Sequence, residues 1–231
     1  MQAPLMNLPP GAAARLAGVL YLFVIVGGLF AEGFVRGQLV VSGDAAATAR
    51  NILEHETLYR LGFAVHLAYL GCAAAVGVIL YRLLRSVSPG LALLALCLDL
   101  VAIAIEAGSL LNHMAVLTWL TDAGLAGVEP AQRHAMAYAH TRAFANGFGG
   151  SLAFFGLFCV ATGVLLVRSR LVPGLIGKMM VLAGACYLVN SYAFFLAPNL
   201  AGLLFPWILL PCLLAELSLA LWLLSKGIRR V

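Results

Sequence analysis

Six stretches of this sequence are each long and apolar enough to cross a lipid bilayer as a helix, which takes about 20 residues. Because 63% of the residues are hydrophobic and only 10% are charged, the chain has too little polar surface to cover a soluble globule. We therefore predict an all-α fold, a polytopic transmembrane bundle of six helices in a single domain, residues 1–231. The expected spans are residues 14–34, 61–84, 91–120, 145–167, 172–196 and 201–224.

The basic residues lie at the ends of these spans rather than in one stripe, so no nucleic acid is expected as a partner. Nine of the 14 lie on one side, namely Arg15, Arg82, Arg85, Arg168, Arg170, Lys178, Lys226, Arg229 and Arg230. Five lie on the other, namely Arg36, Arg50, Arg60, Arg133 and Arg142. The positive-inside rule then predicts that both termini are cytoplasmic, with membrane lipid as the surrounding partner.

The two longer outer connections each contain a short helical pattern. Asp44 is a good N-cap for the alanine-rich segment that follows it, which we expect to form a short helix on the membrane surface. Pro130 suits the first turn of a second short helix, which ends before the span at 145–167. His134 and His140 lie six apart and so point about 120° away from each other, which disfavours a metal pair.

The third span carries three ionisable residues at intervals of seven: Asp99, Glu106 and His113. Seven residues are nearly two helical turns, so the three side chains form one seam along the helix. Each would cost at least about 2.5 kcal/mol if it faced hydrocarbon at mid-depth. The seam is therefore expected to face other protein or internal water. Gly149, Gly156 and Gly163 also repeat every seven residues, which predicts a groove for another helix.

Counting residues from the middle of each span sorts the buried polar groups by depth. His66, His113 and Asn190 fall in the outer half, and Glu106 is central. The cytoplasmic half holds Asp99, Lys178 and Glu216. A structural ion pair between Lys178 and Asp99, which Glu216 could share, accounts for the inner layer.

The main functional hypothesis is a buried site for a lipid-like or apolar small molecule. Glu106 and His113 are its candidate acid-base residues, and His66, Asn112, Tyr187 and Asn190 are its candidate ligand contacts. A simpler interpretation of the outer layer is a hydrogen bond between His66 and Asn190.

Three alternatives remain open. His66 and His113 could ligate a haem iron or another metal. Asp99, Glu106 and Glu216 could relay protons in a proton-coupled transporter, or the chain could be a structural membrane subunit. Because the sequence contains no GxSxG, phosphate-binding loop or HExxH motif, nothing indicates nucleophilic catalysis.

Long stretches resemble a bacterial family known as domain of unknown function 4386. The most specific matching residues are Phe154, Phe155 and Gly156, the turn at 173–177, and Glu216 with Trp222 and Gly227. The resemblance implies a polytopic bacterial membrane protein of about six helices, located in the inner membrane, and it implies no activity. His66 occupies a position where the family resemblance implies an acidic residue, which disfavours a haem role as a family trait.

Overall fold

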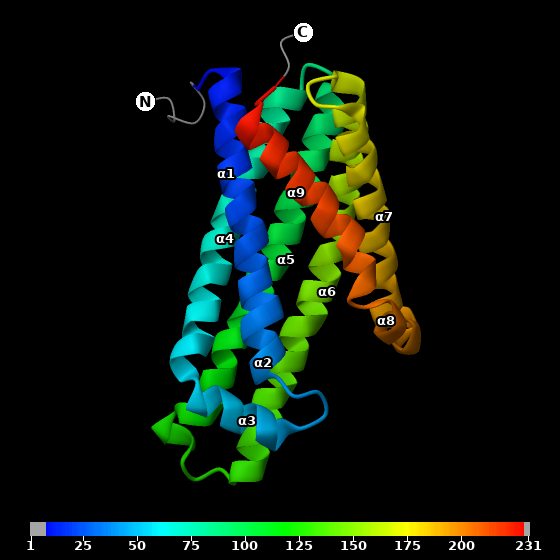
Figure 1. The fold of residues 1–231 in the computed structure, drawn as a ribbon. Helices are drawn as coiled ribbons and strands as arrows, with labels where there is room; N and C mark the ends of the chain where they lie inside the picture. Colours follow the sequence, from blue (N-terminus) through cyan, green and yellow to red (C-terminus); the bar gives the residue numbers. More distant parts are fainter. Residues whose placement is uncertain (1–7, 229–231) are drawn as a thin grey trace. The chain divides into compact units, whose positions relative to one another are not determined.

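The computed structural model describes residues 8–228, and its regular structure there is entirely helical (Figure 1). Six helical segments are long and apolar enough to cross a membrane, as predicted: Pro10–Leu39, Glu56–Leu84, Pro89–Thr121, Pro130–Ser169, Gly174–Leu196 and Trp207–Ser225. The all-α, six-helix prediction is therefore confirmed. Arg229 and Arg230, which count toward the predicted orientation, lie outside the described residues.

The elements follow one another along the chain as α1 (Pro10–Gly28), the π-helix η2 (Leu29–Arg36), α2 (Gly37–Leu39), α3 (Ala45–Glu54), α4 (Glu56–Leu84), α5 (Pro89–Thr121), the 3₁₀-helix η3 (Ala123–Leu125), α6 (Pro130–Ser169), α7 (Gly174–Leu196), α8 (Pro198–Leu204), the 3₁₀-helix η4 (Trp207–Leu209) and α9 (Leu210–Ser225).

These elements form two compact units. Unit 1 comprises the residues up to Ile25, Gly71–Ile103 and the residues from Gly149 onward, and unit 2 comprises Val26–Leu70 and Ala104–Phe148. Helices α1, α4, α5 and α6 contribute residues to both units. That the chain forms a single domain stays a prediction.

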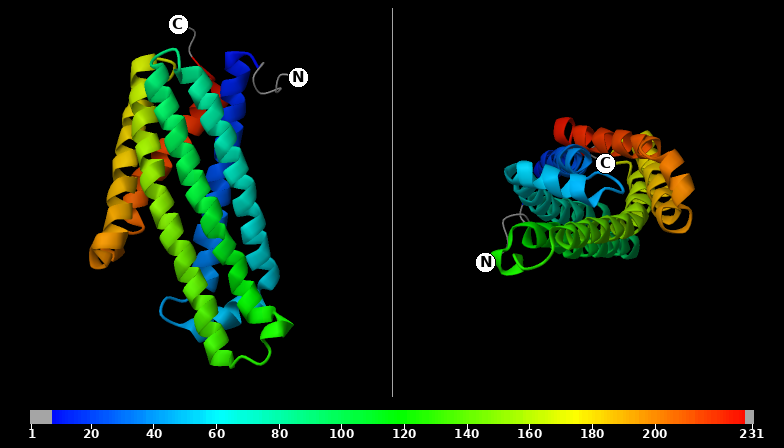
Figure 2. Two further views of the ribbon diagram at one scale, coloured as in Figure 1. Left: turned by 180° about the vertical axis from the view of Figure 1, so that it is seen from behind. Right: turned by 90° about the horizontal axis from the view of Figure 1, so that it is seen from below.

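Glycines bring α6 and α7 together in unit 1, where the two helices run side by side (Figure 2). A Cβ on Gly163 would lie 2.6 Å from the carbonyl oxygen of Gly177, and one on Gly156 would lie 2.9 Å from that of Gly184. The predicted glycine groove is thus confirmed, with α7 as the helix that fills it. Gly149, the third member, faces the ring of Phe194.

The expected sixth span, residues 201–224, is broken rather than bent. Helix α8 ends at Leu204, and a continuous helix resumes only with α9 at Leu210. Pro206 lies between them, where its missing N–H and its ring would disrupt a helix interior. Pro211 causes no such break because it occupies the first turn of α9, where its backbone nitrogen needs no partner.

In unit 2, α3 forms at the predicted place and is capped as expected. The Asp44 side chain accepts a hydrogen bond from the Ala47 N–H at 2.8 Å. The buried face of α3, which includes Ala49 and Ile52, packs with Val35 and Val116 in the unit 2 core. This packing holds α3, between α2 and α4 (Figure 1), against the core of unit 2, whose polar groups are described below.

The predicted short helix after Pro130 and the span at 145–167 are one continuous helix, α6, of 40 residues. The separate short helix was therefore a wrong prediction. The glycines after residue 146 do not interrupt α6, and one of them is needed for packing. A Cβ on Gly147 would overlap the Ser109 hydroxyl of α5, only 1.7 Å away.

Candidate functional site

Unit 2 brings together four side chains that are predominantly buried: Glu32, His66, Tyr69 and Glu106, which we call the His66 cluster. His66 and Tyr69 lie three residues apart on α4 and therefore share one face of that helix. Glu106 comes from α5 and Glu32 from the π-helix η2. π-Helical segments are rare and are frequent at functional sites, and the eight-residue η2 changes the direction of its side chains relative to an α-helix.

His66 is the centre of the cluster and is only 1% exposed. Its Nε2 atom lies 2.8 Å from Glu106 Oε1, and its Nδ1 atom lies 3.6 Å from Glu32 Oε1. Each ring nitrogen therefore faces a different carboxyl group. An imidazole in this position can accept a proton at one nitrogen and release a proton from the other.

Tyr69 closes the cluster on the Glu106 side. Its hydroxyl donates a short hydrogen bond to Glu106 Oε1 and lies 2.6 Å from His66 Nε2. The Tyr69 ring also stacks on the imidazole, with the ring centroids 4.5 Å apart. Glu106 and His66 thus share one hydroxyl group that can donate to either of them.

Arg36 extends the cluster at its more exposed end. Its guanidinium lies 3.8 Å from Glu32, donates to the Thr141 carbonyl oxygen at 3.2 Å and sits 4.8 Å over the Phe144 ring. Arg36 therefore places a positive charge beside the Glu32 carboxyl group.

Aromatic rings enclose the imidazole. Phe144 and Phe148 meet the His66 ring edge-on, with centroids 5.7 and 6.5 Å away. Phe144 also packs edge-on against His113, at 6.0 Å. These rings keep the surroundings of the cluster apolar, which strengthens every charge interaction within it.

His113 links α4 to α5 through a reciprocal pair of hydrogen bonds. Tyr59 donates its hydroxyl to the His113 carbonyl oxygen at 3.0 Å, and His113 Nε2 lies 3.1 Å from the Tyr59 carbonyl oxygen. A carbonyl oxygen only accepts, so Nε2 carries the hydrogen. The two rings stack at 3.9 Å. This geometry gives His113 a structural bond, whereas its predicted acid-base role stays a prediction.

A small cavity in unit 2 is lined by Arg36, Val40, Tyr59, His113, Thr141 and Phe144. Its volume of about 10 Å³ is enough for roughly one water molecule. A lipid chain would need far more room.

The seam on α5 faces protein, as predicted from its spacing. The three seam residues are largely inaccessible from outside, with exposed fractions of 2% for Asp99, 12% for the Glu106 side chain and 7% for His113. Asp99 belongs to unit 1, where its Oδ2 atom lies against α4 at Gly77. The other two seam residues belong to unit 2.

The remaining candidate residues have other partners. Asn112 Oδ1 lies 2.9 Å from His140 Nδ1 in unit 2. In unit 1, Tyr187 donates to Glu216 Oε1 at 2.6 Å, and Asn190 is half-buried. Within unit 2, His66 bonds to Glu106 and Tyr69, and its hydrogen bond with Asn190 of unit 1 stays a prediction.

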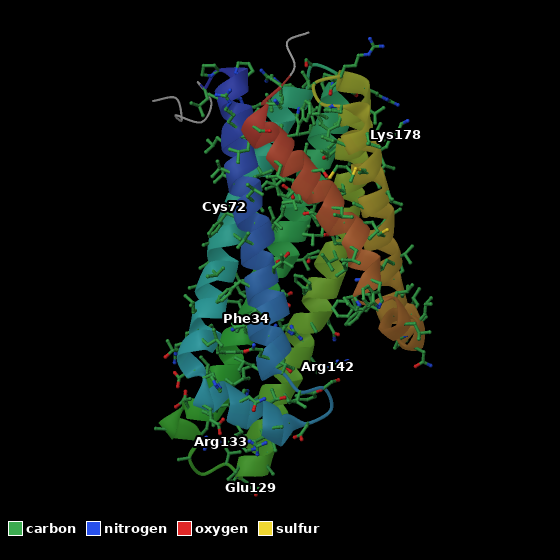
Figure 3. The ribbon with its side chains drawn as sticks, viewed as in Figure 1. Phe34, Cys72, Glu129, Arg133, Arg142 and Lys178 are labelled. Atoms are coloured by element: carbon green, nitrogen blue, oxygen red, sulfur yellow. The ribbon has the colours of Figure 1, made fainter. Side chains whose placement is uncertain are left out.

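The predicted ion pair of Lys178 with Asp99 is not formed. Lys178 is exposed at the start of α7 (Figure 3) and makes no ion pair within residues 8–228. Asp99 and Glu216, in contrast, are buried. The exposed position near the helix end explains the difference, since a lysine there reaches solvent or headgroups more easily than the interior.

Within the described residues, no group of three or more His, Cys, Asp or Glu side chains is arranged to hold a metal ion. Phe144 packs against both His66 and His113, where a haem ligated by the two would need space.

Sequence reasoning did not include Glu32, Tyr69 or Arg36 in the site. Helical spacing could have identified Tyr69, since it lies one turn from His66 on the same helix. Spacing could not have identified Glu32 and Arg36, because their placement depends on a π-helix that residue spacing alone does not reveal.

Comparisons with known proteins bear on the whole chain rather than on this site. The sequence model of the family described as Domain of unknown function (DUF4386) matches residues 16–227. No curated protein and no solved structure gives a significant match. With a match over nearly its whole length and six membrane-spanning helices, the chain belongs to the DUF4386 family of membrane proteins.

Proposed function

We propose that this chain transfers protons within the membrane through the His66 cluster, as part of a proton-coupled transport function. The observation that supports the proposal is the position of His66, a buried imidazole whose two nitrogens face two different carboxyl groups. Ionisable groups inside membrane-spanning helices are costly, and they commonly mark proton or ion pathways.

The proposed transfer uses both faces of the imidazole. A proton arriving from Glu32 binds Nδ1, and the proton on Nε2 passes to Glu106 or, through the hydroxyl, by way of Tyr69. The Nδ1–Glu32 separation of 3.6 Å is longer than a hydrogen bond. Transfer on that side therefore requires a side-chain rotation or one bridging water. Arg36 stabilises the Glu32 carboxylate once its proton has left.

A site for a lipid-like ligand is less well supported than proton transfer. The unit 2 cavity has room for about one water molecule, and its Arg36 side borders the cluster. Such a cavity suits the delivery of water or protons to Glu32 rather than the binding of an acyl chain.

The proposal places the chain in the inner membrane of a bacterium with both termini in the cytoplasm. The asymmetric distribution of Lys and Arg supports this orientation. Membrane lipid is the expected partner of outward-facing apolar side chains such as Leu111 and Leu196, which are 72 and 78% exposed.

Proton flux into liposomes tests the proposal. Purified protein is reconstituted into vesicles that contain a trapped pH-sensitive dye, and a potassium diffusion potential set with valinomycin drives protons inward. Wild-type vesicles should acidify faster than protein-free vesicles. His66→Gln should abolish the difference, because an amide cannot exchange protons at two nitrogens.

The matched control is His55→Gln, which removes an exposed histidine of the same unit. It should leave the flux unchanged. The proposal is contradicted if wild-type vesicles acidify no faster than protein-free vesicles. It is also contradicted if vesicles with the His66→Gln protein acidify as fast as those with the wild type.

A further inference from the structure

Unit 1 contains a buried carboxyl group that the proposed function does not use, Glu216 on α9. It is 6% exposed and accepts a hydrogen bond from the Tyr187 hydroxyl of α7 at 2.6 Å. Within residues 8–228, no Lys, Arg or His forms an ion pair with Glu216. An ionised carboxylate in such a position would lack the opposite charge that normally offsets the cost of its burial.

A second hydroxyl group lies beside Glu216. The Tyr21 hydroxyl of α1 is buried, with the residue 3% exposed, and its partner among the described residues is the Glu216 carboxyl group. It is also close enough to Asp99 for an electrostatic interaction. A hydroxyl group can donate to a carboxylate or accept from a protonated carboxyl group, so Tyr21 can serve both states of Glu216.

We propose that Glu216 is a proton-binding site of unit 1, with the bound proton on Oε2 donated to the Tyr21 hydroxyl while Oε1 accepts from Tyr187. This single proton removes the uncompensated charge and lets Glu216 donate to Tyr21. Release of the proton leaves a carboxylate that, within the described residues, accepts from the Tyr187 and Tyr21 hydroxyls. The site is independent of the His66 cluster, since every residue in it belongs to unit 1.

Several other titratable groups face this carboxyl group and belong to its surroundings. Those on the packed elements are Tyr21 of α1, Asp99 of α5, Cys159 of α6, Tyr187 of α7 and Cys212 of α9. All of them are neutral or negative, so none supplies a compensating positive charge. A proton on Glu216 is therefore the simplest source of neutrality.

Infrared difference spectroscopy on protein in lipid nanodiscs tests the site directly, with a series of buffers from acidic to alkaline pH. At neutral pH the wild type should show the carbonyl stretch of a protonated carboxyl group. The spectrum of Glu216→Gln should lack the part of this band that one carboxyl group contributes. Tyr187→Phe should keep the band and shift it to higher frequency, because the hydrogen bond to Oε1 is gone. Glu129→Gln, at an exposed glutamate that is ionised at neutral pH, should leave the neutral-pH band unchanged.

Spectra of wild type and Glu216→Gln that match over the whole pH series would overturn the proposal. So would a band that appears only when choline replaces sodium, since the site would then hold Na⁺ rather than a proton. If Glu216→Gln fails to fold, the Tyr187→Phe variant still tests the proposal, because an unshifted band would mean that the protonated carboxyl group is not Glu216. Because His66 is intact in all of these variants, their outcome does not depend on the proton-flux measurement.

Discussion

His66 Nε2 and Glu106 Oε1 lie 2.8 Å apart although 40 residues separate them in the chain. The contact joins α4 to α5 inside unit 2, and it places one of the seam residues next to a histidine whose other nitrogen faces Glu32. Neither carboxyl group would be expected at such a place for packing alone, because apolar residues of similar volume would cost less to bury. The arrangement is more consistent with proton exchange than with structural reinforcement.

Glu106→Gln separates these two roles. Glutamine keeps the volume and can still accept from Tyr69 and His66, so we expect a loss of unfolding free energy below about 2 kcal/mol. Proton flux in liposomes should fall at least tenfold, because the amide cannot take up the proton. Thermal unfolding in detergent and the dye assay measure the two effects.

Glu54→Gln is the control for this substitution. Glu54 is exposed at the end of α3, and the variant should match the wild type in both assays. If Glu106→Gln instead lost its fold and its flux together, the carboxyl group would have a structural role.

Tyr59→Phe tests the link between α4 and α5. The substitution removes the hydroxyl that donates to the His113 carbonyl oxygen at 3.0 Å and leaves that buried oxygen with one partner fewer. We expect a destabilisation of about 1 kcal/mol, seen as a lower midpoint of thermal unfolding. Tyr192→Phe, at a tyrosine that is 61% exposed, should have no effect. Equal midpoints for the two variants would mean that the Tyr59 hydroxyl contributes nothing to the link.

Gly163→Ala tests the close approach of α6 and α7. The added methyl would meet backbone atoms of α7 at 2.6 and 2.7 Å, which cannot move aside as a flexible side chain can. The helices must separate, and we expect a loss of about 2 kcal/mol or more, in the range of overpacked cores.

Gly150→Ala on the same helix is the matched control, since no heavy atom lies within 4 Å of the new Cβ. Alanine has the higher helix propensity, so this variant should gain about 0.5–1 kcal/mol. A Gly163→Ala protein as stable as Gly150→Ala would contradict the packing described for these helices. Unfolding midpoints in one detergent compare the three proteins.

How much could be predicted from the sequence depended on how local the signal was. The number of spans, the Asp44 cap and the glycine spacing of α6 follow from local patterns, and the structure has all three. The break at Pro206 within the predicted span 201–224 was not predicted, because spacing does not show whether neighbouring helices can compensate for a lost hydrogen bond.

The depth of each residue in its span does not predict which side chains meet in the candidate site. His66, Glu106 and His113 belong to unit 2, and Asn190 and Tyr187 belong to unit 1. Glu32 reaches the imidazole from a π-helix, and the partner of His66 is fixed by which face of α5 meets α4. Such contacts between helices follow from tertiary packing and not from the sequence of either helix.

Lys178→Gln tests one of those contacts, the ion pair expected between Lys178 and Asp99. In the structure Lys178 is exposed and Asp99 is buried against Gly77, so removing the ammonium should leave no unpaired charge. We expect a change in unfolding free energy of no more than about 0.5 kcal/mol, as for other surface substitutions. Breaking a buried pair would instead cost about 3–5 kcal/mol. Chemical unfolding in detergent distinguishes these values, and a loss in the larger range would restore the ion pair and require α7 to be rotated from its present position.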